Sequence, residues 1–153
     1  MSGYQIVSEA LIEPFKLYHG SPVQNLKTLN PSRISSNNHH DGVVVSATED
    51  IKYAAAFTFK NSTGDKLDKR GRHTWYSWRG FTDDANVINI NSKFKNLILK
   101  TPCSIYIVDK KHFSKSKDYD EYISTNPVRV IKELKYKNTI EALEKNGVEV
   151  RFI

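Results

Sequence analysis

The sequence contains only one cysteine, Cys103, in 153 residues. A single cysteine excludes an internal disulfide and any zinc site built from several thiolates, and it is typical of a reducing compartment. The run that follows it, Ser104 to Val108, predicts a strand that buries the thiol as a structural group. We therefore expect a cytoplasmic protein with one buried thiol.

Long apolar runs are also missing. No segment approaches the roughly 20 residues that a membrane-spanning helix needs, and residues 1 to 16 contain Glu9 and Glu13 but no basic start like that of a signal peptide. Hydrophobic residues make up 39% of the chain and charged residues 26%, which is typical of a globular protein. The length predicts a single domain, residues 1–153, with no membrane partner.

The charge is unbalanced, with 23 Lys and Arg against 17 Asp and Glu, or a net charge of +6. Such an excess favours an anionic partner, although many soluble proteins carry it without one. The basic residues gather between Lys60 and Phe81, where aromatic side chains are interleaved with them. The residues predicted to bind a single-stranded nucleic acid, by charge and by stacking, are Arg70, Arg72, Trp75 and Trp78. Alternatively, the tryptophans anchor a long surface loop whose charges stay in water.

The first motif is Tyr18-His19-Gly20-Ser21. Leu17 and Tyr18 favour a strand, and Gly20 followed by Pro22 is expected to end it, with His19 at its mouth.

A second motif runs from Val43 to Phe57. Its β-branched start predicts a buried strand, and the alanines that follow predict a helix for which Thr48 is a natural N-cap. On that helix Tyr53 is one turn from Phe57, so its ring is expected on the apolar face and not in water.

Together these motifs resemble the nucleotide-binding half of the ADP-ribosyltransferase fold, in the histidine-tyrosine-glutamate branch that includes diphtheria toxin and the poly(ADP-ribose) polymerases. The likeness covers about a third of the chain. It implies NAD as the substrate, with His19 on a ribose hydroxyl, Gly20 giving its backbone access to the nicotinamide carboxamide, Ser21 adding a hydroxyl contact and Tyr53 stacking on the ring. His19 and Tyr53 would then belong to the catalytic set.

Cleavage of the bond between nicotinamide and ribose develops positive charge on the sugar, which a carboxylate can stabilise. In the family this glutamate lies on a late strand. Glu121 is the best placed here, with Glu133 near the end of a strand and Glu149, expected to face water, as rivals. The resemblance thus makes Glu121, His19 and Tyr53 the predicted catalytic residues.

The remaining pattern predicts an α+β fold with a split, mostly antiparallel β core and a few short helices, similar to the ADP-ribosyltransferases. Short strands are expected at Val87–Ile90, Ser104–Val108, Glu121–Ser124, Val128–Ile131 and Val148–Phe152. Residues 96–99 are predicted as a short strand or a helix-to-strand join. A last helix should begin after Asn138 and stop at Asn146-Gly147.

No metal site is expected, because the adjacent pair His39-His40 cannot easily ligate one ion and no acid or cysteine cluster completes a site. Three functions stay open. The first is an NAD-dependent mono-ADP-ribosyltransferase whose acceptor is a protein or a nucleic acid. The second is an RNA 2′-phosphotransferase or NAD glycohydrolase relative, and the third is a non-catalytic module of the same fold that binds nucleic acid or protein.

Overall fold

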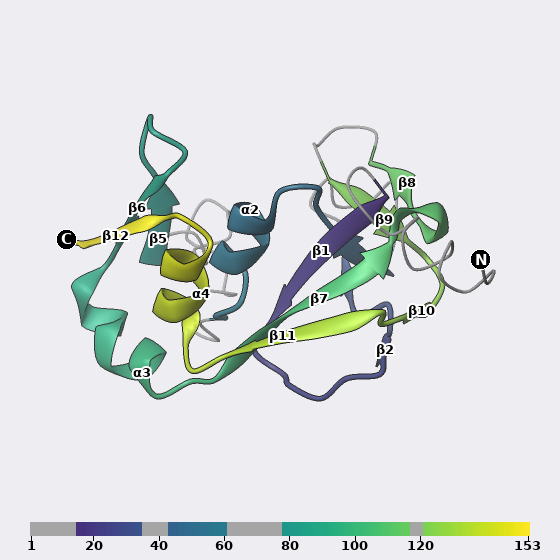
Figure 1. Cartoon of the computed structure of the whole chain (residues 1–153), viewed down its shortest axis with the longest axis horizontal. Helices are drawn as coiled ribbons and strands as arrows, with labels where there is room; N and C mark the ends of the chain where they lie inside the picture. Colours follow the sequence, from purple (N-terminus) through teal and green to yellow (C-terminus); the bar gives the residue numbers. More distant parts are fainter. Residues whose placement is uncertain (1–14, 35–42, 61–77, 117–120) are drawn as a thin grey trace, which may run out of the picture. The chain divides into compact units, whose positions relative to one another are not determined.

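A computed structural model describes residues 15–34, 43–60, 78–116 and 121–153 (Figure 1). In these ranges helices and strands are mixed, and most strand pairs are antiparallel, as predicted for an α+β protein. The described α-helices are α2 (Ile51–Ala56), α3 (Lys95–Leu99) and α4 (Thr139–Lys145). Two short 3-10 helices are η3 (Ser92–Phe94) and η4 (Lys110–His112).

The strands are short, and they pair in four small sheets with the orders β1-β7-β11, β10-β2, β12-β6-β5 and β3-β4-β9-β8. Their bounds are β1 (Lys16–Ser21), β2 (Thr28–Leu29), β3 (Arg33–Ile34), β4 (Val43–Ala47), β5 (Arg79–Phe81), β6 (Val87–Ile90), β7 (Cys103–Asp109), β8 (Ser114–Lys115), β9 (Tyr122–Ser124), β10 (Val128–Arg129), β11 (Lys132–Tyr136) and β12 (Glu149–Phe152).

Two compact units make up the chain. The first comprises Met1–His19, Asn25–Ile51 and Tyr106–Leu134. The second comprises Gly20–Gln24, Lys52–Ile105 and Lys135–Ile153. Each unit is described by itself below, and the single-domain expectation stays a prediction.

The first unit is built around an apolar cluster to which strands β1, β2, β4, β7 and β10 contribute. Its buried members are Leu17, Leu29, Val45, Ala47, Tyr106, Val108 and Val128. The Val43–Val45 run forms β4 as predicted, and β4 pairs antiparallel with β9 in the register Ser46 to Ile123 and Ala47 to Tyr122. The one polar atom of Tyr106 is satisfied, because its hydroxyl accepts from the Leu26 amide at 3.2 Å and donates to Glu133 at 3.3 Å.

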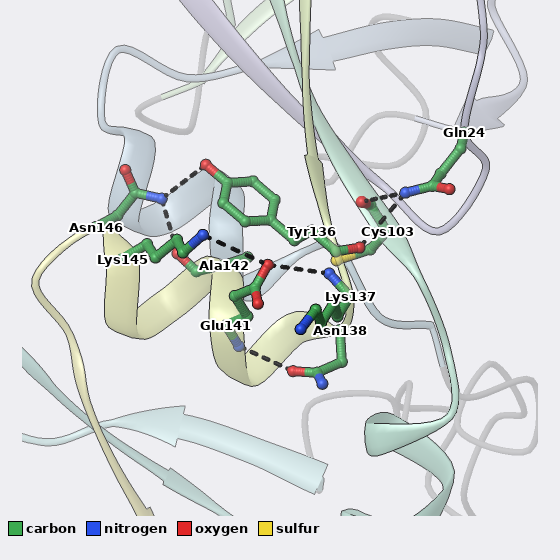
Figure 2. Close-up of polar contacts among 9 residues, drawn as sticks. All are labelled: Gln24, Cys103, Tyr136, Lys137, Asn138, Glu141, Ala142, Lys145 and Asn146. Atoms are coloured by element: carbon green, nitrogen blue, oxygen red, sulfur yellow. Dashed lines mark hydrogen bonds and ion pairs between the residues drawn. The ribbon is translucent and has the colours of Figure 1, made fainter.

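In the second unit β6 is the central strand of its sheet, parallel to β12 and antiparallel to β5. Ile88 and Ile90 of β6 are fully buried, as the apolar run 87–90 predicted. Helix α4 follows the capping prediction closely, as Figure 2 shows. The Asn138 side chain accepts from the Glu141 amide at 2.9 Å, and Gly147 takes the left-handed conformation at φ +86° that a helix stop requires.

Side-chain hydrogen bonds connect this helix to β11, and Gln24 connects β11 to β7 (Figure 2). The Asn146 amide donates to the Ala142 carbonyl at 2.7 Å and to the Tyr136 hydroxyl at 3.1 Å. Gln24 donates from its side chain to the carbonyls of Cys103 at 2.9 Å and Tyr136 at 3.4 Å. These bonds give partners to carbonyl groups at the first residue of β7 and the last residue of β11.

Three local predictions need correction. Strand β1 does not stop at Gly20 but continues through it to Ser21. Helix α2 begins at Ile51, because the Thr48 hydroxyl accepts from the Asp50 amide at 3.1 Å and closes a turn before the helix. Strand β11 runs through Glu133 to Tyr136, although a strand end was expected near Glu133. The segment Lys95–Leu99 is helical and leads into β7, which agrees with the helix-to-strand join that was one of its two predicted alternatives.

Gly20 explains why β1 can pass its predicted end. A Cβ atom placed on Gly20 would lie 2.1 Å from the Ala54 carbonyl oxygen and 3.1 Å from the Phe57 carbonyl carbon. Helix α2 therefore packs directly on the backbone of β1, and only a residue without a side chain fits there. The glycine serves helix packing and does not end the strand.

We predict that Gly20→Ala lowers the free energy of unfolding by about 1–3 kcal/mol or more, because its methyl group would overlap a backbone atom that cannot move alone. Chemical denaturation with the exposed variant Gly80→Ala as a control tests this, since a Cβ atom at Gly80 meets nothing within 4 Å. Equal stability of the two variants would contradict the packing account.

Cys103 supplies a second prediction. The thiol is buried, as the sequence indicated, and burial raises its pKa, against the hydrogen bonds from Thr58 and Thr139 that act to lower it. In the folded protein, alkylation should be at least tenfold slower than after denaturation at the same pH. Because the folded pKa is raised, the thiol's contribution to stability is complete below the unfolded pKa of about 8.5 and falls as the pH rises above it. Equal alkylation rates in the two states would show that the thiol is accessible.

Candidate functional site

His19 lies in β1 within the first unit, half-buried, and its ring is held by a backbone group. The Nδ1 atom is 2.6 Å from the carbonyl oxygen of Ser46 in β4. A carbonyl only accepts, so Nδ1 carries the proton, and in the neutral ring Nε2 is then the hydrogen-bond acceptor. This tautomer can receive a hydrogen bond from a sugar hydroxyl, which is the role that the resemblance implies for His19.

The next two residues belong to the second unit. Gly20 is in contact with α2, as described above. Ser21 is 7% exposed, and its hydroxyl accepts from the Val23 amide at 3.0 Å, in the turn that leads the chain out of β1. The hydroxyl that was predicted to contact NAD is therefore engaged with the chain's own backbone.

Tyr53 stands on α2, but its environment differs from the expected one. The side chain is 48% exposed, so the prediction that the ring avoids water is wrong. The ring is nevertheless held by aromatic neighbours, because its centroid is 5.0 Å from that of Phe57 and 6.3 Å from that of Phe81, with the Phe81 ring nearly parallel at 14°. An exposed ring with a fixed plane is suited to stacking on a flat ligand.

The three candidate glutamates separate by their surroundings. Glu121 is half-buried directly before β9, and its carbonyl accepts from the Ser116 amide at 2.8 Å. Glu133 accepts at 2.8 Å from the amide of Asn25, which has a left-handed φ of 67°, and also from the Tyr106 hydroxyl. Glu149 is exposed, as expected, and paired with Arg151. Glu133 thus has a structural function. Glu121 directly precedes β9, which pairs with β4, and β4 accepts the hydrogen bond from His19.

The nucleic-acid prediction changes for one residue. Trp78 is only 1% exposed and packs edge to face on Phe59, with ring centroids 5.0 Å apart. It is therefore not available for the stacking predicted for it. Arg70, Arg72 and Trp75 lie outside the described residues.

Two side-chain groups were missed. In the first unit Tyr122 donates to Glu49 at 2.6 Å, and hydrogen bonding to Tyr122, together with the charge of Glu49, raises the pKa of Lys110. In the second unit Arg79 lies between aromatic rings. Burial lowers its pKa to about 10, so it remains a cation at neutral pH. In the sequence Arg79 was one of the basic residues between Lys60 and Phe81, and nothing there distinguished it from the others.

Predicted NAD-site residues line neither of two shallow cavities in the part of the chain that the structure describes. One, of about 290 Å³, lies in the first unit against η4 and the ends of β8 and β9. The other, of about 350 Å³, lies beside α4 in the second unit. Within the described ranges no three His, Cys, Asp or Glu side chains group as a metal site would need, and no helix there is long and apolar enough to cross a membrane.

Comparisons with protein-family models, with curated proteins and with solved structures each found no match. The functional interpretation therefore depends on the motifs and on the contacts within each unit.

The structural function of Glu133 is testable. Glu133→Ala should lower the free energy of unfolding by about 1–3 kcal/mol, because the Asn25 amide and the Tyr106 hydroxyl both lose their acceptor. Thermal or chemical denaturation measures the change, with Glu149→Ala as the exposed control. A stability loss no larger than that of the control would contradict a structural function for Glu133.

Proposed function

We propose that the protein is an NAD-dependent mono-ADP-ribosyltransferase. The observation that supports this most is the contact of Gly20 with Ala54 in the second unit. The His-Gly element and the helix that carries the tyrosine were two separate matches in the sequence, 33 residues apart from Gly20 to Tyr53, and nothing in either match required them to meet. Their direct packing is what a nucleotide site built from both elements needs.

In this proposal the substrate is NAD and the reaction breaks the bond between the nicotinamide nitrogen and the ribose C1′. Nicotinamide leaves with the bonding electron pair, and an acceptor nucleophile adds to C1′ and loses its proton. Tyr53 stacks on the nicotinamide through its exposed ring. His19, with its proton on Nδ1, accepts a hydrogen bond from a ribose hydroxyl at Nε2.

Glu121 is the proposed acid that stabilises the positive sugar. The choice rests on its place directly before β9, the late strand that pairs with β4, to which His19 is hydrogen-bonded. The acceptor in this proposal is a protein or a nucleic acid, and the net charge of +6 favours an acidic one. A carboxylate near the developing charge acts mainly in the transition state, since the ground-state ribose is neutral.

The test is nicotinamide release and NAD affinity, measured side by side. Glu121→Gln should leave NAD affinity nearly intact and lower turnover by about 10²–10³-fold, because the carboxylate acts on a charge that forms only during the reaction. His19→Ala and Tyr53→Ala should weaken NAD binding as well, because both contacts already exist in the ground state.

Glu149→Gln is the matched control, because Glu149 is exposed and belongs to a surface ion pair. Normal turnover in Glu121→Gln together with loss of turnover in the control would show that Glu149, and not Glu121, is the catalytic acid. The proposed activity would then stand. No nicotinamide release from the unmodified protein, with water, protein or nucleic acid as acceptor, would overturn the proposed function.

A further inference from the structure

Strand β5 directs two side chains to the face of its sheet that is buried. Arg79 pairs with Ile90 and Phe81 with Ile88, and residues directly opposite in an antiparallel pair share a face. Both isoleucines are fully buried, whereas Gly80, which lies between Arg79 and Phe81 in β5, is on the exposed face. The two side chains of β5 therefore lie on the same side as the core of the second unit.

Arg79 is tied to the end of helix α2. Its Nε donates to the carbonyl of Ala56, the last residue of the helix, at 2.5 Å. Its guanidinium carbon is 4.6 Å from the Phe57 ring centroid and 4.5 Å from the Trp78 centroid. A cation suits the negative end of a helix and the faces of aromatic rings, and Arg79 meets both at once.

Phe81 contacts the same helix one turn earlier, at Tyr53. Its ring is stacked on that of Tyr53, whose other aromatic neighbour, Phe57, is the ring on which Arg79 lies. The order of contacts is thus Phe81, Tyr53, Phe57, Arg79 and Trp78. All five belong to the second unit, and the last is buried.

We propose that Arg79 and Phe81 are positioning residues that fix the ring plane of Tyr53 for an incoming planar ligand. This inference rests on the proposed function for its ligand, the nicotinamide ring, but the ordering of Tyr53 can be measured without it. Neither residue touches the reacting bond. An exposed tyrosine without such neighbours would lose rotational freedom on binding, and the aromatic contacts remove that cost in advance.

The chemistry of the two residues favours this function over simple packing. A leucine at position 81 would bury similar apolar area but offer no flat face, and a lysine at position 79 would keep the charge but lose the planar contact with two rings. Each substitution therefore removes orientation more than burial. Both variants are expected to fold.

The experiment uses the full chain labelled with 3-fluorotyrosine, with Tyr53→Phe to assign the Tyr53 resonance among the eight tyrosines. In Phe81→Leu and Arg79→Lys the Tyr53 fluorine signal should shift toward the value of free fluorotyrosine, because the neighbouring ring current is lost or its geometry changes. Phe94→Leu is the control, since Phe94 contacts Lys93 on η3. The control signal should stay in place.

The second readout is the kinetics of nicotinamide release. In both β5 variants the KM for NAD should rise about two- to tenfold, and kcat should change less than twofold, because ring ordering contributes to ground-state binding. An unmoved Tyr53 signal in both variants would overturn the proposal, as would a moved signal with an unchanged KM. If the signal moves but the unmodified protein releases no nicotinamide, the ordering stands and the proposed function fails.

Discussion

The contact between β1 and α2 is the constraint on which the candidate site depends. At Gly20 the helix carbonyl of Ala54 comes so close that a single added carbon atom would lie 2.1 Å from it. Such a close contact fixes the two backbone segments relative to each other, because neither can shift without the other. Tyr53 is covalently next to Ala54, so within the second unit this contact fixes where the tyrosine begins relative to Gly20.

The polar side-chain atoms of three residues are each held by a hydrogen bond to the backbone. The Nδ1 proton of His19 goes to a backbone carbonyl, the hydroxyl of Ser21 accepts from a backbone amide, and the guanidinium of Arg79 reaches the last carbonyl of α2. Backbone partners are insensitive to side-chain motion. In each unit, these side chains are therefore oriented by the path of the main chain.

Sequence reasoning succeeded where the signal was local. The run Val43 to Val45 gave β4, and Asn138 with Gly147 gave both ends of α4, because β-branched residues and helix caps act within a few residues. It failed where the cause was distant. The role of Gly20 is set by Ala54, the ring plane of Tyr53 by Phe81, and the burial of Trp78 by Phe59, and no periodicity encodes such pairs. Glu133 was recognised as a candidate acid, but its amide partner lies 108 residues away.

The shortness of α2 has a thermodynamic consequence. Isolated helices below about 12 residues are marginal in water, and α2 has six. It therefore depends on its tertiary contacts, among them those with β1 and β5, and its own hydrogen bonds contribute little without them. Amide hydrogen exchange in this segment would then report the strength of those neighbours instead of helix propensity. Any molecule that stacks on Tyr53 and binds only the ordered helix must slow this exchange throughout α2, even at residues that it never touches.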